Sequence, residues 1–344
     1  MNRVLLVRLG SLGDIVHAIP VAAALRRAFP AARIDWLVSA KYREILDLVT
    51  VLDRRLSLDG RAQGSFTLLS AVRELRRSRY DVAIDLQGLL KSAALARSSG
   101  SRRVIGFAPS YLREQLARPF YTDVYDPGCG GIYDPRETRH VVQINLGLLE
   151  PLGIEAGNPE FPIEHVESDV ARAMSSQVRV GYVLLNPGAA WPNKRWPASR
   201  FGLVAAALRD RHGLTSVALW GEGERALAEE VATHSSGAAI VAPPASIGDL
   251  VALSRGAKLI VSGDTGPAHI AAAVGTPVVG IFGPTRPSRN GPWLPDDVTV
   301  SRAEICACHH LRRCRLERMC LADIHADEVL EAVERRLGAR ANHV

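Results

Sequence analysis

Residues 262–285 read SGDTGPAHIAAAVGTPVVGIFGPT, and this stretch decides the predicted fold. It follows the apolar run 257–261, continues through a helix of small residues, and ends in a second apolar run, 277–282. Two apolar strands joined by a helix are typical of a parallel βαβ unit. In open parallel sheets, ligands bind at the carboxyl ends of the strands, where the helices begin. The turn 264–269, which joins the first strand to the helix, is therefore the first candidate site.

This turn has the residue types of an anion-binding helix N-terminus. Gly266 lets a ligand approach the backbone, and Pro267 suits the first helical turn. Thr265 is placed to cap the helix with its hydroxyl. Asp264 and His269 add side chains at the same end. The N–H groups and the helix dipole at this end favour phosphate, whereas the plain alternative is a capped helix with a half-buried histidine.

The same alternation of apolar runs with helical patterns extends along the 344-residue chain. In the first half it predicts strands at 3–7, 33–38 and 80–86 and helices at 15–28 and 87–97. In the second half it predicts strands at 181–185, 216–220 and 239–241 and helices at 199–212, 224–233 and 247–254. The pattern lapses over 155–179, where a domain boundary is expected. We therefore predict an α/β protein of two doubly wound, Rossmann-like parallel-sheet domains that face each other across a cleft, spanning 1–165 and 175–325, with a C-terminal helix in 326–344.

The composition is that of a globular enzyme, with 47% hydrophobic and 23% charged residues. The net charge of +6 suits an anionic substrate or a phospholipid surface and does not require nucleic acid. No apolar run approaches the roughly 18 residues of a membrane span. The N-terminal region lacks a signal-peptide pattern, because Arg8 and Asp14 interrupt its apolar residues. We expect a cytosolic protein.

Four of the five cysteines lie between residues 306 and 320. An odd number, crowded in this way, argues against the disulfide framework of a secreted protein. Together with His309 and His310, four thiols would supply enough ligands for a tetrahedral zinc site. Their C-x-C-x5-C-x5-C spacing lacks the paired C-x2-C knuckles of common zinc modules. We therefore expect reduced thiols beside Arg312 and Arg313, and no metal.

Two further loops follow predicted strands of the second half. The first carries Lys194 and Arg195, whose charge suits a diphosphate leaving group, although two surface cations are the alternative. The second is a glycine turn with Glu222 and Glu224, whose carboxylates are able to accept both ribose hydroxyls. This turn also matches the G-x-G-x-x-A pattern of dinucleotide-binding proteins. The next strand ends in Val241-Ala242-Pro243, without the acidic residue that binds an NAD ribose, so we reject an oxidoreductase.

In the first half, Asp14 directly follows Gly13 at the start of a predicted helix. A carboxylate there gains from the helix dipole and stays ionised, which suits a general base, although an N-terminal cap is an equal alternative. Gln87 and Lys91 lie four residues apart on one helix face. With Arg113 they form a candidate pocket for an anionic acceptor.

The motifs together resemble the lipopolysaccharide heptosyltransferases of glycosyltransferase family 9. The matching blocks span almost the whole chain, and their order and spacing are more specific than any one of them. They are RLGSLGDIVH at 8–17, DLQGLLKSAA at 85–94, REQLA at 113–117 with FY at 120–121, KRWP at 194–197, DTGPAH at 264–269 and FGPT at 282–285.

The resemblance implies a GT-B fold and the inverting transfer of a heptose from ADP-heptose to a Kdo sugar of nascent lipopolysaccharide. It implies no cofactor beyond this ADP-sugar donor and no metal. The implied acceptor is of the Kdo-lipid A type, at the cytoplasmic face of the inner membrane. This places the protein in the cytoplasm, peripheral to that membrane, with no nucleic acid and no stable protein partner.

The resemblance also implies roles for single residues. Asp14 matches the general base, Lys194 a ligand of the donor phosphates, and Glu224 or its neighbour Glu222 the ligand of the donor ribose. The other donor positions are Asp264, Thr265, Gly266 and His269. The acceptor positions are Gly13, Gln87, Lys91 and Arg113.

Two alternatives remain open. Ala189 and Ala190 stand where members of the family carry threonine hydroxyls for the donor, which leaves room for a family-9 transferase of another sugar or a later acceptor. A sugar-nucleotide epimerase also has two Rossmann-like domains. An epimerase, however, needs no acceptor pocket in its first domain, so Gln87, Lys91 and Arg113 favour the transferase.

Overall fold

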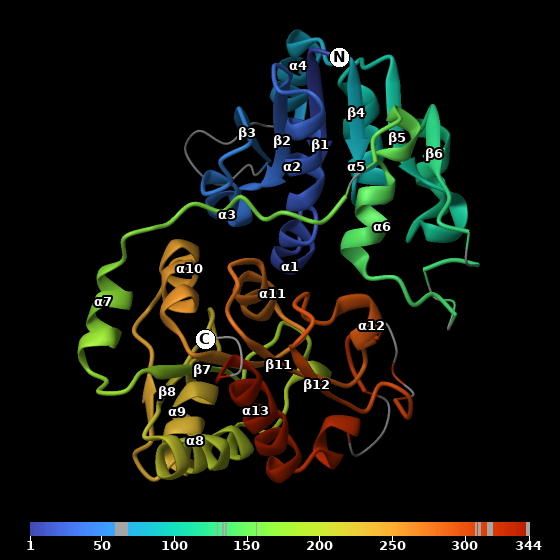
Figure 1. Cartoon of the computed structure of the whole chain (residues 1–344). Helices are drawn as coiled ribbons and strands as arrows, with labels where there is room; N and C mark the ends of the chain where they lie inside the picture. Colours follow the sequence, from blue (N-terminus) through green and yellow to red (C-terminus); the bar gives the residue numbers. More distant parts are fainter. Residues whose placement is uncertain are drawn as a thin grey trace. The chain divides into compact units, whose positions relative to one another are not determined.

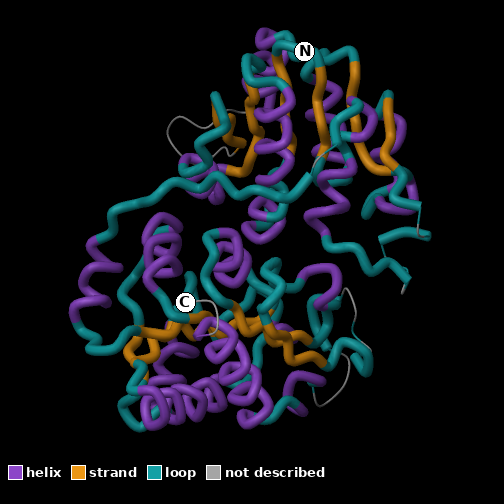
Figure 2. Tube along the Cα trace, in the orientation of Figure 1, coloured by secondary structure: helices purple, strands orange, loops and turns teal. Residues whose placement is uncertain are grey.

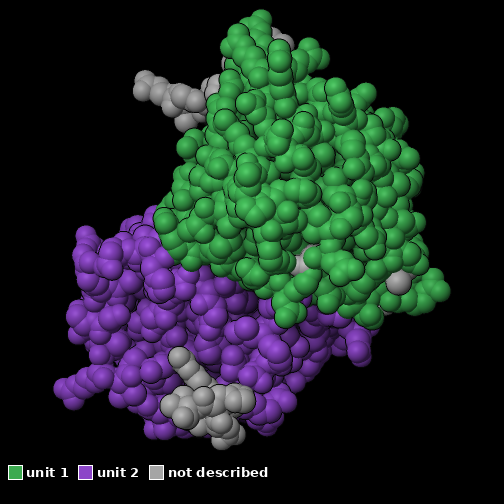
Figure 3. Space-filling model, turned by 45° about the horizontal axis from the view of Figure 1, so that its top comes forward, with its two compact units in different colours: residues 1–164 green, residues 165–344 purple. Residues whose placement is uncertain are grey.

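The computed structural model describes residues 1–58, 68–128, 130–132, 134, 136–155, 157–306, 308, 311–314 and 319–341. The chain divides into two compact units, Met1–Glu164 (unit 1) and His165–Val344 (unit 2), which Figure 3 colours separately. Each unit has one sheet at its centre and helices around it (Figures 1 and 2).

The sheet of unit 1 has six strands, all paired in parallel, in the order β3-β2-β1-β4-β5-β6. The strands are β1 (Arg3–Val7), β2 (Arg33–Ser39), β3 (Arg54–Leu58), β4 (Val82–Asp85), β5 (Arg103–Phe107) and β6 (Asp123–Tyr125). β1 is fully buried after its first residue, as expected of a strand covered on both faces. Val7 and Asp85 lie opposite each other, so β1 and β4 end side by side.

Helices cover both faces of this sheet. They are α1 (Leu12–Val16), α2 (Ile19–Ala28), α3 (Arg43–Asp47), α4 (Leu68–Ser78), α5 (Leu90–Ser98) and α6 (Val141–Gly147), with 3-10 turns η1 (Ala40–Tyr42), η2 (Pro109–Tyr111), η3 (Gln115–Phe120) and η4 (Glu150–Leu152). α2 packs against α6, and α4 packs against α5 (Figure 1).

The prediction of one continuous helix over 15–28 is wrong. The chain instead forms α1 and α2, separated at His17 and Ala18. The N–H of His17 bonds to the carbonyls of Gly13 and Ile15, which closes the last turn of α1. Pro20 then lies in the first turn of α2, where its missing N–H costs no helical hydrogen bond; within a continuous helix it would remove one.

The sheet of unit 2 also has six parallel strands, in the order β12-β11-β10-β7-β8-β9. The strands are β7 (Tyr182–Asn186), β8 (Thr215–Ala218), β9 (Ala239–Val241), β10 (Leu259–Gly263), β11 (Val278–Phe282) and β12 (Val298–Ser301). The helices are α7 (Asp169–Ser176), α8 (Ala198–His212), α9 (Arg225–His234), α10 (Ile247–Gly256), α11 (Gly266–Ala273), α12 (Pro287–Asn290) and α13 (Ala326–Ala341), with 3-10 turns η5 (Pro192–Lys194) and η6 (Cys320–Asp323).

Two apolar clusters fill the two sides of this sheet. One joins the sheet to α8, α9 and α13 and includes Phe201, Val231 and Val333. The other lies under α7, α10 and α11 and includes Met174 and Ala271. Helices on both faces of a parallel sheet confirm the predicted α/β fold class.

Both sheets reverse strand order at a corresponding point. The reversal falls between β1 and β4 in unit 1, and between β7 and β10 in unit 2. In doubly wound sheets, ligands bind outside the carboxyl ends of the strands at such a switch point. In each unit, the loops that follow the two strands at the switch point are therefore the expected place for a ligand site. No helix within the described ranges is long and apolar enough to cross a membrane.

Candidate functional site

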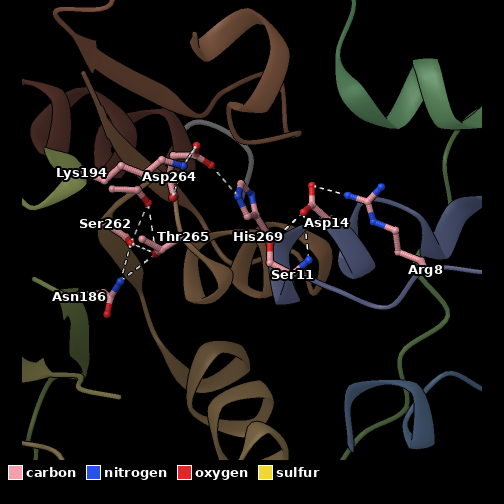
Figure 4. Close-up of polar contacts among 10 residues, drawn as sticks. Arg8, Ser11, Asp14, Asn186, Lys194, Ser262, Asp264, Thr265 and His269 are labelled. Atoms are coloured by element: carbon pink, nitrogen blue, oxygen red, sulfur yellow. Dashed lines mark hydrogen bonds and ion pairs between the residues drawn. The ribbon is translucent and has the colours of Figure 1, made fainter. Parts of the chain in front are cut away.

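Asp14 lies in α1, just beyond the carboxyl end of β1. Its Oδ2 accepts hydrogen bonds from the Ser11 N–H (3.1 Å) and from Ser11 Oγ (2.9 Å), and its Oδ1 lies 2.7 Å from Arg8 Nη2 (Figure 4). Asp14 is thus part of a capping box and also the partner of a guanidinium. The sequence left a general base and an N-terminal cap as alternatives for this residue. In the structure Ser11 is the N-cap residue and Asp14 is the third helical residue of the capping box, with its Oδ1 directed to Arg8.

The charge state of Asp14 follows from its surroundings. Burial raises the pKa of the carboxyl. The guanidinium groups of Arg8 and Arg113 and the hydrogen bonds from Ser11 together lower this pKa by more than burial raises it. The net pKa of Asp14 lies well below its usual range. The carboxylate is therefore ionised at neutral pH. It is a weaker base than an ordinary aspartate as long as no other anion offsets the charges of the two guanidinium groups.

The predicted acceptor residues occupy different places in unit 1. Arg113 acts on the Asp14 carboxyl through its charge. Gln87 Oε1 accepts the Leu9 N–H at 2.7 Å, so this side chain holds the loop that leads to Asp14. Lys91 is exposed on α5, and Gly13 is buried within α1.

Asp85 was not predicted as a site residue, yet it organises the loop after β4. Its fully buried carboxylate accepts hydrogen bonds from the Gln87 N–H (2.9 Å), Ser92 Oγ (2.9 Å) and Tyr121 Oη (2.7 Å). Burial raises its pKa despite these donors. The only signal in the sequence is a charged residue at the end of an apolar strand. Asp85 fixes the position of Gln87 and the first turn of α5.

In unit 2, Asp264 lies at the centre of a second polar network, just beyond the end of β10. Its Oδ2 is 2.6 Å from Lys194 Nζ, and its Oδ1 is 2.9 Å from His269 Nε2 (Figure 4). Because an ionised carboxylate only accepts, His269 donates from Nε2. Asp264 and His269 are almost fully buried. The structure therefore brings Lys194, which lies 70 positions before Asp264 in the sequence, together with Asp264 and His269.

The prediction that Thr265 caps α11 is right in position and wrong in bonding. Thr265 is the N-cap residue with extended backbone angles, but its hydroxyl makes no capping hydrogen bond. Asn186 Nδ2 instead donates to Thr265 Oγ1 (2.9 Å) and to Ser262 Oγ (3.0 Å). Ser262 and Asn186 are register partners in β10 and β7, so sheet pairing brings the three polar groups together. Gly266 follows as the first residue of α11.

Lys194 is positioned by an aromatic ring as well as by Asp264. Its Nζ lies 4.8 Å from the centre of the Trp191 ring. A cation over an indole face is attracted by the ring quadrupole. Lys194 Nζ donates one of its three N–H groups to Asp264 Oδ2 at 2.6 Å. Trp191 was not predicted as a site residue.

Of the two candidate glutamates, Glu224 forms an ion pair with the loop that follows β7. Its Oε1 lies 3.2 Å from Arg195 Nη2, and Arg195 Nε donates to the Ala189 carbonyl at 2.9 Å. A Cβ on Gly188 would lie 2.2 Å from Glu224 Oε2, so only glycine leaves room for this carboxylate. Glu222 is exposed on the same turn.

The Asp264 carboxyl gives a pH dependence to stability. Burial raises its pKa, but Lys194 and the hydrogen bond from His269 lower it further, so that the net pKa is well below its usual range. A folded-state pKa below the unfolded value contributes stability that is present above about pH 4 and is lost as the pH falls towards the folded-state value. We expect Asp264→Asn to lose less unfolding free energy than wild type between about pH 5 and pH 3, as measured by urea unfolding. Equal slopes for the two proteins would contradict the ion-pair assignment.

The cysteine segment contains thiols in close contact. Cys306, Cys308 and Cys320 are buried, Cys314 is partly exposed, and none of the four forms a disulfide. Cys308 and Cys314 have their sulfurs 2.9 Å apart. Burial raises the pKa of the Cys320 thiol to about 12. Within the described ranges, no group of three or more His, Cys, Asp or Glu residues is arranged to hold a metal ion, and His309 and His310 lie outside those ranges.

Comparisons with known proteins place the chain in a family. The sequence pattern of glycosyltransferase family 9 (heptosyltransferase) matches residues 68–320. Lipopolysaccharide heptosyltransferase 1 of Pseudomonas aeruginosa is 31% identical over 315 residues, which cover 89% of this chain and 85% of that protein.

Solved structures agree on the fold. Escherichia coli heptosyltransferase WaaC with ADP has a TM-score of 0.72 at 23% identity, covering 98% of this chain and 99% of that one. The family-9 glycosyltransferase from Veillonella parvula has a TM-score of 0.80 at 23% identity, covering 98% of each chain. These likenesses confirm the predicted GT-B fold. The chain belongs to glycosyltransferase family 9, the heptosyltransferase family, and is a glycosyltransferase.

Proposed function

We propose that this glycosyltransferase moves a heptose from ADP-heptose to the Kdo region of the lipopolysaccharide inner core, with inversion at the anomeric carbon. The observation that carries the proposal is the ionised Asp14 carboxylate, held by Arg8 and Ser11 at the switch point of unit 1. The name of the Pseudomonas aeruginosa relative and the ADP in the WaaC structure support the acceptor class and the donor.

Donor binding is assigned to the loops after β7, β8 and β10. Lys194 and the N-terminus of α11 supply positive charge for the diphosphate. Asp264 and Trp191 keep the Lys194 ammonium in place, so no reorganisation is needed as negative charge develops on the leaving group. Glu224 accepts the ribose hydroxyls, and Arg195 orients its carboxylate.

In the transfer step, the Asp14 carboxylate takes the proton of the acceptor hydroxyl as its oxygen bonds to the anomeric carbon. The bond from that carbon to the phosphate oxygen breaks, and ADP leaves with the electron pair. By itself, the low pKa of Asp14 makes it a weak base for this step. An anionic acceptor paired with Arg113 would offset the charge of that guanidinium, and so raise the pKa of Asp14 at the moment when a stronger base is needed.

Gly188→Ala tests the ribose assignment. The new Cβ would occupy the position of Glu224 Oε2, displace the carboxylate and break its contact with Arg195. Losing hydrogen bonds to a charged acceptor weakens binding by about tenfold or more. We expect the Kd of ADP, measured by calorimetry, to rise accordingly. Gly338→Ala on α13, where a Cβ meets open space, is the matched control and should bind ADP as wild type does; equal affinity of both variants would remove Glu224 from the donor site.

We also propose that transfer needs no divalent metal. The positive charge that a metal would bring to the diphosphate is assigned to Lys194 and the α11 N-terminus instead. The transfer rate should therefore be unchanged after EDTA treatment and dialysis, and added magnesium should not raise it. Loss of activity on chelation, restored by one added metal, would contradict the proposal.

The donor, the acceptor and the reaction type are tested together by measuring ADP or UDP release from a panel of ADP- and UDP-sugars, with and without Kdo-lipid A. The proposed function predicts release from ADP-heptose that depends on the acceptor. Preference for another donor would favour the family-9 alternative to which Ala189 and Ala190 point. Turnover of a nucleotide sugar without acceptor and without nucleotide release is the behaviour of an epimerase and would overturn the proposal.

We further propose that the protein works in the cytoplasm, peripheral to the inner membrane, because its acceptor is a lipid of that membrane. The net charge of +6 supports contact with an anionic surface.

A further inference from the structure

Large apolar side chains are exposed at five described positions, and two of them belong to packed neighbours in unit 1. Leu116 in η3 is 72% exposed, and Leu90 at the start of α5 is 39% exposed. The Leu90 N–H donates to Glu114 Oε2 at 2.7 Å, which ties the first turn of α5 to the segment before η3. α5 and η3 also pack against each other. The two leucines thus lie on two elements of unit 1 that pack against each other.

The 3-10 turn η3 exposes its larger apolar residue to water and buries its smaller one. Ala117 is fully buried, whereas its larger neighbour Leu116 is largely exposed. A soluble surface gains nothing from this arrangement, because burying the leucine would remove more apolar area from water than burying the alanine. Pro119 is exposed and Phe120 half-buried on the same turn. The pattern favours a surface that a non-aqueous phase covers when the protein works.

Cations surround these apolar groups. Lys91 follows Leu90, Arg113 precedes η3, and Arg118 lies within η3. The segment 113–120 and the first turn of α5 contain a single carboxylate, Glu114, and it is engaged by the backbone of Leu90. Apolar side chains among cations match an anionic lipid surface, where the cations meet headgroup phosphates and the apolar groups enter the acyl boundary.

We propose that Leu90, Leu116 and their flanking cations form a docking surface for anionic phospholipid bilayers. The inference rests on the proposed function for its purpose, since a lipid-linked acceptor has to be reached at the membrane. Arg113 connects the docking surface with the proposed transfer site, because it belongs to this surface and its charge also acts on the Asp14 carboxyl. The acceptor sugar would therefore be received beside the base by the same segment that contacts the headgroups.

The experiment is co-sedimentation of the full-length protein with phosphatidylethanolamine vesicles that contain or lack phosphatidylglycerol, without donor or acceptor. We expect wild type to bind the anionic vesicles selectively. Leu116→Glu should weaken this binding by about tenfold or more, because it replaces an inserting group with one that anionic lipid repels. Leu116→Phe keeps the apolar group and should bind as wild type does.

Leu203→Glu is the matched control, since it makes the same change at a 54% exposed leucine on α8 of unit 2. It should bind within about twofold of wild type, because it lies outside the proposed surface. Equal loss for both leucines, no loss for Leu116→Glu, or binding without phosphatidylglycerol would each overturn the proposal. The result is separable from the proposed function, because vesicle binding is measured without transfer, and Leu116→Glu should still release ADP normally with a water-soluble Kdo acceptor.

Discussion

Replacing Asp14 with asparagine is expected to lower the turnover number by about a thousandfold, within the range typical of a lost general base, while donor affinity stays near that of wild type. Asparagine has nearly the same shape and is able to accept the hydrogen bonds from Ser11, but it cannot take a proton. Turnover is measured as acceptor-dependent ADP release, and donor affinity by calorimetry with ADP. Equal losses in both quantities would mean that Asp14 binds donor and does not act as a base.

The chain contains its own control for the structural role of Asp14. Asp249 forms the same capping box in α10, where its Oδ2 accepts hydrogen bonds from the Ser246 N–H (2.9 Å) and Ser246 Oγ (2.8 Å). Asp249→Asn should change the unfolding free energy by about 1 kcal/mol or less and leave turnover unchanged. If Asp14→Asn fails to fold, or if Asp249→Asn loses turnover as Asp14→Asn does, then Asp14 is a cap and the proposed mechanism is wrong.

Lys194→Met is expected to lower kcat/KM for the donor by about a hundredfold to a thousandfold, the usual effect of removing one preorganised partner of a developing negative charge. It should also destabilise the fold by about 3 kcal/mol, because it leaves the buried Asp264 carboxylate without its ammonium partner. Donor kinetics and urea unfolding measure the two effects separately. Lys41→Met, which removes an exposed lysine near the Tyr42 ring, should change neither quantity.

A second substitution separates the two roles of Lys194. Adding Asp264→Asn to Lys194→Met removes the uncompensated charge, so part of the lost unfolding free energy should return. Turnover should stay low, because the diphosphate still lacks its cation. If the double variant regained both stability and activity, the Lys194–Asp264 pair would be a structural ion pair with no role in transfer.

The elements that fix the sites were predictable because their signals are strong and local. The stretch 262–285 predicts β10, α11 and β11, since long apolar runs alternate with a glycine-proline turn. The edge strands β3, β6 and β12 were not predicted, and neither was β5, a mostly buried strand inside the sheet of unit 1. Edge strands are only half covered, and the residues of these three are mostly intermediate in burial, so no apolar run marks them. The break between α1 and α2 was missed because the apolar pattern continues through it.

The candidate residues follow the same division. Asp14, Lys194, Asp264 and His269 were predicted as candidates because they lie in the loops or first helical turns that follow apolar strands, where ligands bind. Asn186 was not assigned a role, because its partners Ser262 and Thr265 lie across the sheet. Arg8 and Trp191 have partners close in sequence, Asp14 and Lys194, but the residue order of a loop does not show which side chains meet. Pattern analysis along a chain carries no information about such partners. Their contacts appear only in the folded structure.

Product analysis by mass spectrometry tests acceptor-dependent heptose transfer and the role of Asp14 as its base in one experiment. Wild type, Asp14→Asn and Asp249→Asn are each incubated with ADP-heptose and Kdo-lipid A, and the lipid is analysed by mass spectrometry. We expect one added heptose with wild type and Asp249→Asn, and almost none with Asp14→Asn. An unmodified lipid with folded wild-type protein, or heptose addition by Asp14→Asn at the wild-type rate, would contradict this expectation.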